Sequence, residues 1–67
     1  MDFLEKARIR LEHWISHSEH HLEEYEMFAE QLEESGKKKS ASKIREMIDL
    51  ESKSTECLRS ALKNLEK

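Results

Sequence analysis

The sequence predicts an all-α fold, a long antiparallel two-helix hairpin that dimerises into a four-helix bundle. The only glycine, Gly36, lies near the midpoint of the 67-residue chain, and there is no proline. Apolar residues recur at alternating steps of three and four on both sides of it, which is typical of paired helices. A second apolar line on each side predicts the dimer, because one hairpin can cover only one line per helix. We expect one helical-hairpin domain over residues 1–67.

The first helix is expected over about residues 3–35, which are rich in good helix formers. Its main apolar line predicts the seam against the second helix. That line consists of Leu4, Ala7, Leu11, Trp14, Ser18, His21, Tyr25, Phe28 and Leu32. The second apolar line consists of Ile15, Leu22 and Ala29. Trp14 and Tyr25 are interpreted as anchors of the core or of the interface.

The turn is expected at about residues 36–37, and the second helix over about residues 38–66. Gly36 follows a periodic segment, so we expect it to end the first helix in the left-handed conformation. The main line of the second helix consists of Ala41, Ile44, Ile48, Glu51, Thr55, Leu58, Leu62 and Leu65. Its second line consists of Met47, Leu50, Ser54, Cys57 and Ala61.

Charge is divided unevenly between the two halves of the chain. Residues 1–35 hold three basic and ten acidic side chains, and residues 36–67 hold nine basic and five acidic ones. An antiparallel hairpin lays the acidic stretch Glu23–Glu34 beside Lys37–Arg45, so we expect cross-helix ion pairs that favour this pairing. The formal net charge of −3 argues against a nucleic-acid partner.

Membrane and secreted classes are not expected. No apolar run approaches the roughly 18 residues that span a bilayer. The start of the chain carries charges where a signal peptide would be apolar, and the single cysteine, Cys57, cannot form an internal disulfide. We therefore expect a cytoplasmic protein.

Four histidines lie within nine residues: His13, His17, His20 and His21. On a helix, His13, His17 and His21 form one stripe at spacings of four, and Glu24 follows His21 by three. Imidazole pairs at this spacing bind borderline divalent metals such as Zn, Ni, Co or Cu. The candidate metal ligands are His13, His17, His21, Glu24 and Glu51.

The polar members of the two main lines coincide. With a turn near residue 36, positions whose numbers add to about 73 face each other, which places His21 near Glu51 and Ser18 near Thr55. In one interpretation His17 and His21, with Glu51 or Glu24, bind a divalent metal, and dimerisation completes its coordination. In the other, His21 donates to Glu51, Ser18 bonds Thr55, and this zone sets register and oligomeric state.

The run from His13 to His21 resembles a motif of a family of small, poorly characterised prokaryotic helical-hairpin proteins. Its pattern is His-Trp-Ile-x-His-Asn-x-x-His, which Trp14, Ile15 and the three histidines of the stripe match. The resemblance covers about residues 8–65, with Ser18 in place of the usual Asn and Thr55 in place of a second one. It implies a hairpin fold, a site at the histidines, and an association with nickel or cobalt handling.

These observations predict a small non-enzymatic accessory protein that binds Zn, Ni or Co through His17 and His21. The alternative is a purely structural interaction module whose polar positions set the geometry of the dimer. An enzyme with a di-metal carboxylate centre is not expected, because such centres use Glu-x-x-His on two helices and the second helix here has no histidine. The expected partner is a second copy of the chain, and a further protein partner is left open without being identified.

Overall fold

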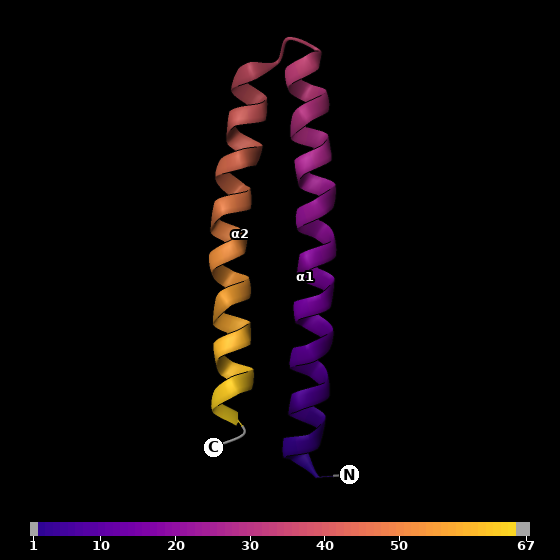
Figure 1. Cartoon of the computed structure of the whole chain (residues 1–67), viewed down its shortest axis with the longest axis vertical. Helices are drawn as coiled ribbons and strands as arrows, with labels where there is room; N and C mark the ends of the chain where they lie inside the picture. Colours follow the sequence, from indigo (N-terminus) through magenta and orange to yellow (C-terminus); the bar gives the residue numbers. More distant parts are fainter. Residues whose placement is uncertain (1, 66–67) are drawn as a thin grey trace.

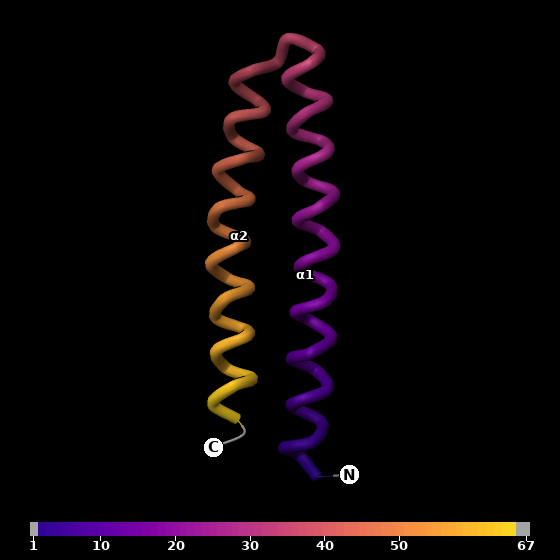
Figure 2. The backbone as a smooth tube through the Cα atoms, viewed as in Figure 1, coloured from indigo at the N-terminus to yellow at the C-terminus, as the bar shows by residue number. Residues whose placement is uncertain are grey.

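The chain folds into two antiparallel α-helices joined by a short turn, as the computed structural model in Figure 1 shows. Helix α1 spans Phe3–Glu34 and helix α2 spans Lys38–Leu65. The structure describes residues 2–65, and this part of the chain contains no strand, so the predicted all-α hairpin is confirmed. The backbone trace in Figure 2 has the turn at one end and the start of α1 beside the end of α2 at the other. No helix in the described range is long and apolar enough to cross a membrane.

The helices begin where the sequence predicts. At the start of α1, the side chain of Asp2 accepts a hydrogen bond of 2.9 Å from the backbone N–H of Glu5. This satisfies one of the N–H groups that the first helical turn leaves without a partner. Helix α2 ends at Leu65 within the described residues, and its predicted end at residue 66 lies outside them.

The turn is a Schellman motif around Gly36, whose φ of 82° is the predicted left-handed conformation. The N–H of Lys37 donates to the carbonyl of Leu32 at 2.9 Å, and the N–H of Gly36 donates to that of Glu33 at 3.0 Å. Ser35 is the C-cap, so α1 ends one residue earlier than predicted. These bonds satisfy carbonyls of the last turn and reverse the chain within three residues.

The seam on α2 is the predicted one, because every member of its main line is buried or half-buried. On α1 the assignment of Trp14 and Phe28 to the seam is wrong. Both side chains are 50% exposed, whereas Ala29 is buried and Ile15 is half-buried. Leu4, also predicted in the seam, is 59% exposed at the start of α1. A straight helix drifts by about 20° per heptad, so a strict seven-residue repeat rotates away from a straight partner. The small residues Ala29 and Ala41 are almost fully buried between the two helices, at 1% and 0% exposure.

Two ion pairs between the helices define one face of the hairpin. Glu19 pairs with Arg59, and Glu33 pairs with Arg45, in agreement with the predicted cross-helix pairing near the turn. The two glutamates are fourteen residues apart along α1, and the two arginines are fourteen apart along α2. Fourteen residues are two heptads, so each pair of positions lies on one side of its helix. We call this side the charged face.

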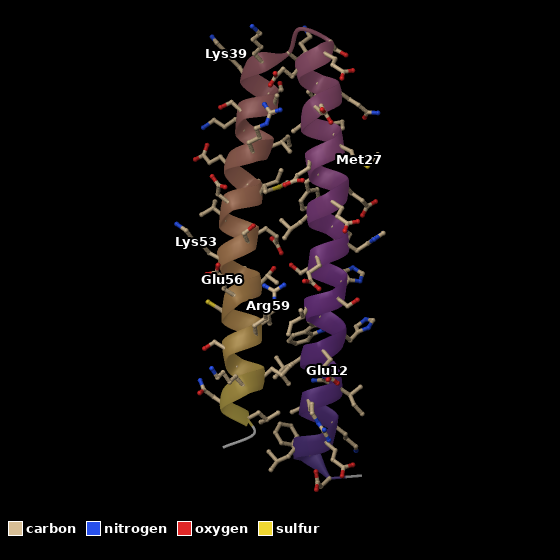
Figure 3. All side chains as sticks on the ribbon, viewed as in Figure 1. Glu12, Met27, Lys39, Lys53, Glu56 and Arg59 are labelled. Carbon is tan, nitrogen blue, oxygen red and sulfur yellow. The ribbon has the colours of Figure 1, made fainter. Side chains whose placement is uncertain are left out.

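The opposite side carries the histidines, and we call it the histidine face. By helical spacing we assign to it Trp14, His17, His21 and Phe28 of α1 and Met47, Leu50, Ser54, Cys57 and Ala61 of α2. Phe28 and Lys43 line one shallow surface groove, so they lie on the same side of the hairpin. Steps of seven lead from Phe28 to His21 and Trp14, and from Lys43 to Leu50, so both lines share this face. In Figure 3, Arg59 lies between the helices, whereas Met27 and Lys53 point away from the hairpin.

Candidate metal site

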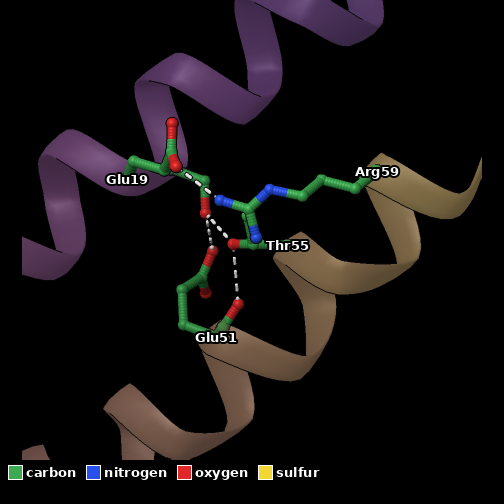
Figure 4. Close-up of polar contacts among 5 residues, drawn as sticks. Glu19, Glu51, Thr55 and Arg59 are labelled. Carbon is green, nitrogen blue, oxygen red and sulfur yellow. Dashed lines mark hydrogen bonds and ion pairs between the residues drawn. The ribbon is translucent and has the colours of Figure 1, made fainter. Parts of the chain in front are cut away.

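Ser18, Glu51 and Thr55 form a closed set of polar contacts between the helices, and we call them the polar layer. The hydroxyl oxygens of Ser18 and Thr55 are 2.5 Å apart, which confirms the predicted Ser18–Thr55 contact. Thr55 donates to the carbonyl of Glu51 at 2.9 Å, and Ser18 donates to Oε1 of Glu51 at 3.2 Å. Figure 4 shows these contacts beside the Glu19–Arg59 ion pair, which borders the layer.

The bond from Thr55 to Glu51 constrains the hydrogens of the polar layer. When the one hydroxyl hydrogen of Thr55 goes to the Glu51 carbonyl, the oxygen of Thr55 is the acceptor in its contact with Ser18. The Ser18 hydrogen is then shared between Thr55 and the Glu51 carboxylate. Among the described residues, no buried side-chain nitrogen or oxygen lacks a partner. A buried polar group is costly only when it is unpaired, and in this layer each such group has a partner within the chain.

The histidine stripe forms a separate cluster beside the polar layer. Nε2 of His17 and Nε2 of His21 face each other at 2.7 Å. Nδ1 of His21 lies 3.2 Å from Oε1 of Glu24. The ring of Tyr25 stacks on the ring of His21, with centroids 5.8 Å apart and an interplanar angle of 12°. His21 is therefore held from two sides, and its Nε2 points at His17.

The predicted pairing of His21 with Glu51 is wrong. The two ring nitrogens of His21 contact His17 and Glu24 of its own helix, and Glu51 accepts from Ser18 instead. His21 lies at the edge of the seam. Its side-chain rotamer therefore determines whether the ring contacts residues of α2 or residues of α1. The contacts along its own helix are available at spacings of three and four, without crossing the seam.

The contacts of His21 relate its two ring nitrogens to each other. A carboxylate can only accept, so if the hydrogen of a neutral His21 is on Nδ1 beside Glu24, its Nε2 is the acceptor in the contact with Nε2 of His17. This hydrogen bond occupies the position where a metal would bridge the two imidazoles, once the His17 hydrogen moves to its other ring nitrogen.

The geometry of the pair needs little change to accept a metal. Tetrahedral Zn²⁺ with Zn–N bonds of about 2.0–2.1 Å holds two nitrogens about 3.3 Å apart. The observed separation is 2.7 Å, so the rings must part by about 0.6 Å, which small rotations of exposed side chains supply. Glu24 would then act as the carboxylate that orients a metal-binding imidazole, an arrangement common in zinc sites.

The structure divides the candidate metal ligands into three groups. His17, His21 and Glu24 lie together. The ring of His13 lies next in the stripe, with its centroid 5.9 Å from that of His17, and Glu51 belongs to the polar layer. Within residues 2–65 there is no group of three or more His, Cys, Asp or Glu side chains that could hold a metal ion together. Within residues 2–65, the candidate ligands thus provide one facing pair of imidazole nitrogens rather than a larger cluster.

The predicted core and interface residues fall into three classes of burial. Ser18 and Thr55 are buried, whereas Trp14, Phe28 and Leu50 are half or more exposed. The half-buried residues are Leu11, Tyr25, Ile48, Leu58 and Leu62. Two further contacts were not anticipated, the stacking of Tyr25 on His21 and the Glu19–Arg59 ion pair. The spacing of four between His21 and Tyr25 was a usable signal for the first of these.

A family model described as a domain of unknown function, DUF8180, matches residues 7–65. The chain belongs to this family. The matched range of DUF8180 includes the histidine stripe, the polar layer, the Gly36 turn and nearly all of α2. The expectation of a poorly characterised family is thereby confirmed. No curated protein and no solved structure matches the chain.

Proposed function

We propose that this protein is a small non-enzymatic metal-binding protein that takes up a divalent transition metal, Zn, Ni or Co, through His17 and His21. The observation that carries the proposal is the facing pair of Nε2 atoms, 2.7 Å apart, with Glu24 on the other nitrogen of His21. Neutral imidazole nitrogens suit these borderline metals, and a carboxylate behind one of them raises its basicity. The exposed position of the pair on α1 supports binding and delivery rather than catalysis in an enclosed site.

Calorimetric titration of the untagged, chelator-stripped chain with Zn²⁺, Ni²⁺ and Co²⁺ tests the proposal. We expect micromolar or tighter binding in the wild type. The double variant His17→Ala/His21→Ala should bind the metal more than about 100-fold more weakly. Losing a residue that only orients a ligand typically costs about 10–100-fold in metal affinity, and this variant loses both ligands. His20→Ala is the matched control, because His20 is 74% exposed and lies outside the facing pair. Absence of heat in the wild type, or unchanged binding in the double variant, rejects the proposal.

We also infer that two copies associate into a four-helix bundle through the histidine face. Its large apolar side chains Trp14, Phe28 and Leu50 are 50%, 50% and 63% exposed in the single hairpin. Covering the exposed half of such a side chain contributes about 1 kcal/mol, so several together support a stable dimer. Sedimentation analysis should give twice the chain mass of 8.0 kDa. Leu50→Lys should shift the protein toward the monomer, whereas the control Lys53→Glu, on the outer side of α2, should not.

The second candidate function is a structural interaction module without a metal. The polar layer supports it, because Ser18, Glu51 and Thr55 satisfy one another and set the register by themselves. The two functions differ in how stability responds to metal. A ligand at 100 times its Kd that binds only the folded state stabilises it by about 2.7 kcal/mol. Thermal melting with and without Zn²⁺ separates them, since the structural module predicts no shift. A cytoplasmic location suits either function, because the exposed thiol of Cys57 stays reduced there.

A further inference from the structure

The metal site of one chain is incomplete. Zinc sites in proteins use three or four side-chain ligands, and the facing pair of His17 and His21 supplies two. Glu24 is engaged by Nδ1 of His21, and residues 2–65 contain no larger group of potential ligands. The remaining ligands must therefore come from outside the chain, and the exposed face around the pair shows where.

Met47 and Ala61 on α2 are placed symmetrically about Ser54, seven residues to either side of it. Leu50 and Cys57, four before and three after Ser54, depart from this symmetry by one residue. Consider a twofold axis that lies between two copies, perpendicular to their helices, at the height of Ser54. This axis would pack α2 of one copy antiparallel on α2 of the other. Met47 would then meet Ala61 of a second copy, so that a large side chain faces a small one.

The histidines of α1 are centred at the same height along the hairpin. The Ser18–Thr55 contact fixes the relative heights of the helices, so Ser54 lies level with Glu19. His17 and His21 are two residues to either side of Glu19, or about 3 Å along the axis at 1.5 Å per residue. An axis at the height of Ser54 therefore brings His17 of one copy opposite His21 of the other. The residues around Ser54 on α2 and the two histidines on α1 therefore indicate a twofold axis at the same height along the hairpin.

We propose that two copies pack antiparallel, histidine face on histidine face, about this axis, and that they hold one divalent transition metal between four imidazoles. The ligands are His17 and His21 of each copy, and Glu24 of each copy orients its own His21. This inference rests on the proposed function and adds to it the source of the missing ligands, the stoichiometry and the orientation of the dimer.

The size and charge of the face agree with this occupant. The hairpin measures 51 by 17 Å across its broad side, so this side is long enough to accommodate the roughly 800 Å² per partner of a standard stable interface. The basic residues of α1 are Lys6, Arg8 and Arg10, all near its start, while Glu23–Glu34 at its end are strongly acidic. Antiparallel packing of α1 on α1 brings opposite charges together, whereas parallel packing of the same two helices would bring like charges together.

Disulfide trapping tests the axis independently of metal. In a Cys57→Ala background, Ser54→Cys places a thiol on the axis, where it meets its own copy. Mild oxidation should convert this variant largely to a covalent dimer. The control is Lys53→Cys in the same background, because Lys53 points away from the hairpin (Figure 3). This variant should run as a monomer in non-reducing gel electrophoresis. Failure of Ser54→Cys to cross-link, or equal cross-linking of the control, overturns the proposed axis.

Stoichiometry and cobalt spectroscopy test the four-imidazole centre in the wild-type chain. We expect one Co²⁺ per two chains and the intense visible absorption of a tetrahedral site. One Co²⁺ per chain overturns the shared centre but leaves the proposed function standing, whereas no binding at all overturns both. A near-ultraviolet thiolate-to-cobalt band that disappears in Cys57→Ala also overturns it. That result would mean that α2 of the second copy, rather than its α1, covers the histidines.

Discussion

The hydroxyl pair of Ser18 and Thr55 offers a sharp test of how the hairpin holds its register. Thr55→Val keeps the shape of the side chain, which is 1% exposed, and removes its hydroxyl. The variant loses the bond to the Glu51 carbonyl and the acceptor at 2.5 Å from Ser18. Ser18→Ala removes the donor that Thr55 and the Glu51 carboxylate share. Both substitutions therefore delete the same contact between the helices.

The expected magnitudes follow from these contacts. A net intramolecular hydrogen bond contributes about 0.5–1.5 kcal/mol to stability. Thr55→Val removes two, so we expect a loss of about 1–2 kcal/mol, and Ser18→Ala should cost about 1 kcal/mol. The double variant should cost about 1 kcal/mol less than the sum of the single variants, because the shared bond is counted in each of them.

Urea denaturation at one fixed protein concentration measures these effects, since stability depends on concentration wherever chains associate. With a slope near 1 kcal/mol per molar urea, a loss of 1 kcal/mol lowers the midpoint by about 1 M. Circular dichroism at 222 nm follows the helices directly. Strictly additive losses in the double variant would refute the reasoning, because they would mean that the two hydroxyls act independently.

Three further outcomes are expected. Gly36→Ala should destabilise the hairpin by about 1 kcal/mol, because its φ of 82° is unfavourable for alanine. Nothing lies within 4 Å of an added Cβ, so the cost comes from the backbone conformation alone. The effect should be seen as a lower Tm, and an unchanged Tm would contradict it. Glu24→Ala should weaken Zn²⁺ binding about 10–100-fold in calorimetry, and the exposed neighbour Glu23→Ala should leave it unchanged; equal effects would argue against an orienting carboxylate. Arg59→Ala should cost less than about 1 kcal/mol in the same urea assay, because its partner Glu19 is half-exposed, and a larger loss would show that the pair belongs to the polar layer.

The heights of residues along the hairpin could be predicted from the sequence. Gly36 is the one residue that adopts a left-handed turn without strain, and its position determines which residues of the two helices lie level. The Ser18–Thr55 contact follows from that position alone. The α2 seam was equally clear, because its main line is far more apolar than the rest of that helix.

The rotation of α1 about its axis could not be predicted in the same way. Trp14 and Phe28 compete with Ile15 and Ala29 for the seam, and both lines are apolar at heptad spacing. The structure buries Ala29 and leaves the two aromatic rings half-exposed. Ala29 is 1% exposed, so it is closely covered by α2, and which line of α1 meets that surface depends on α2 rather than on any pattern within α1.

The sequence by itself therefore determined the helices, the turn, the level of each residue and the presence of a histidine stripe, because these depend on spacing along one chain. Only the tertiary structure decided which way the side chains turn. It directed His21 to His17 and Glu24 rather than to Glu51, and it left Trp14 on the face where we propose that the second copy binds. Spacing sets which groups are within reach, but side-chain rotation and helix rotation select among them, and these depend on packing against the other helix.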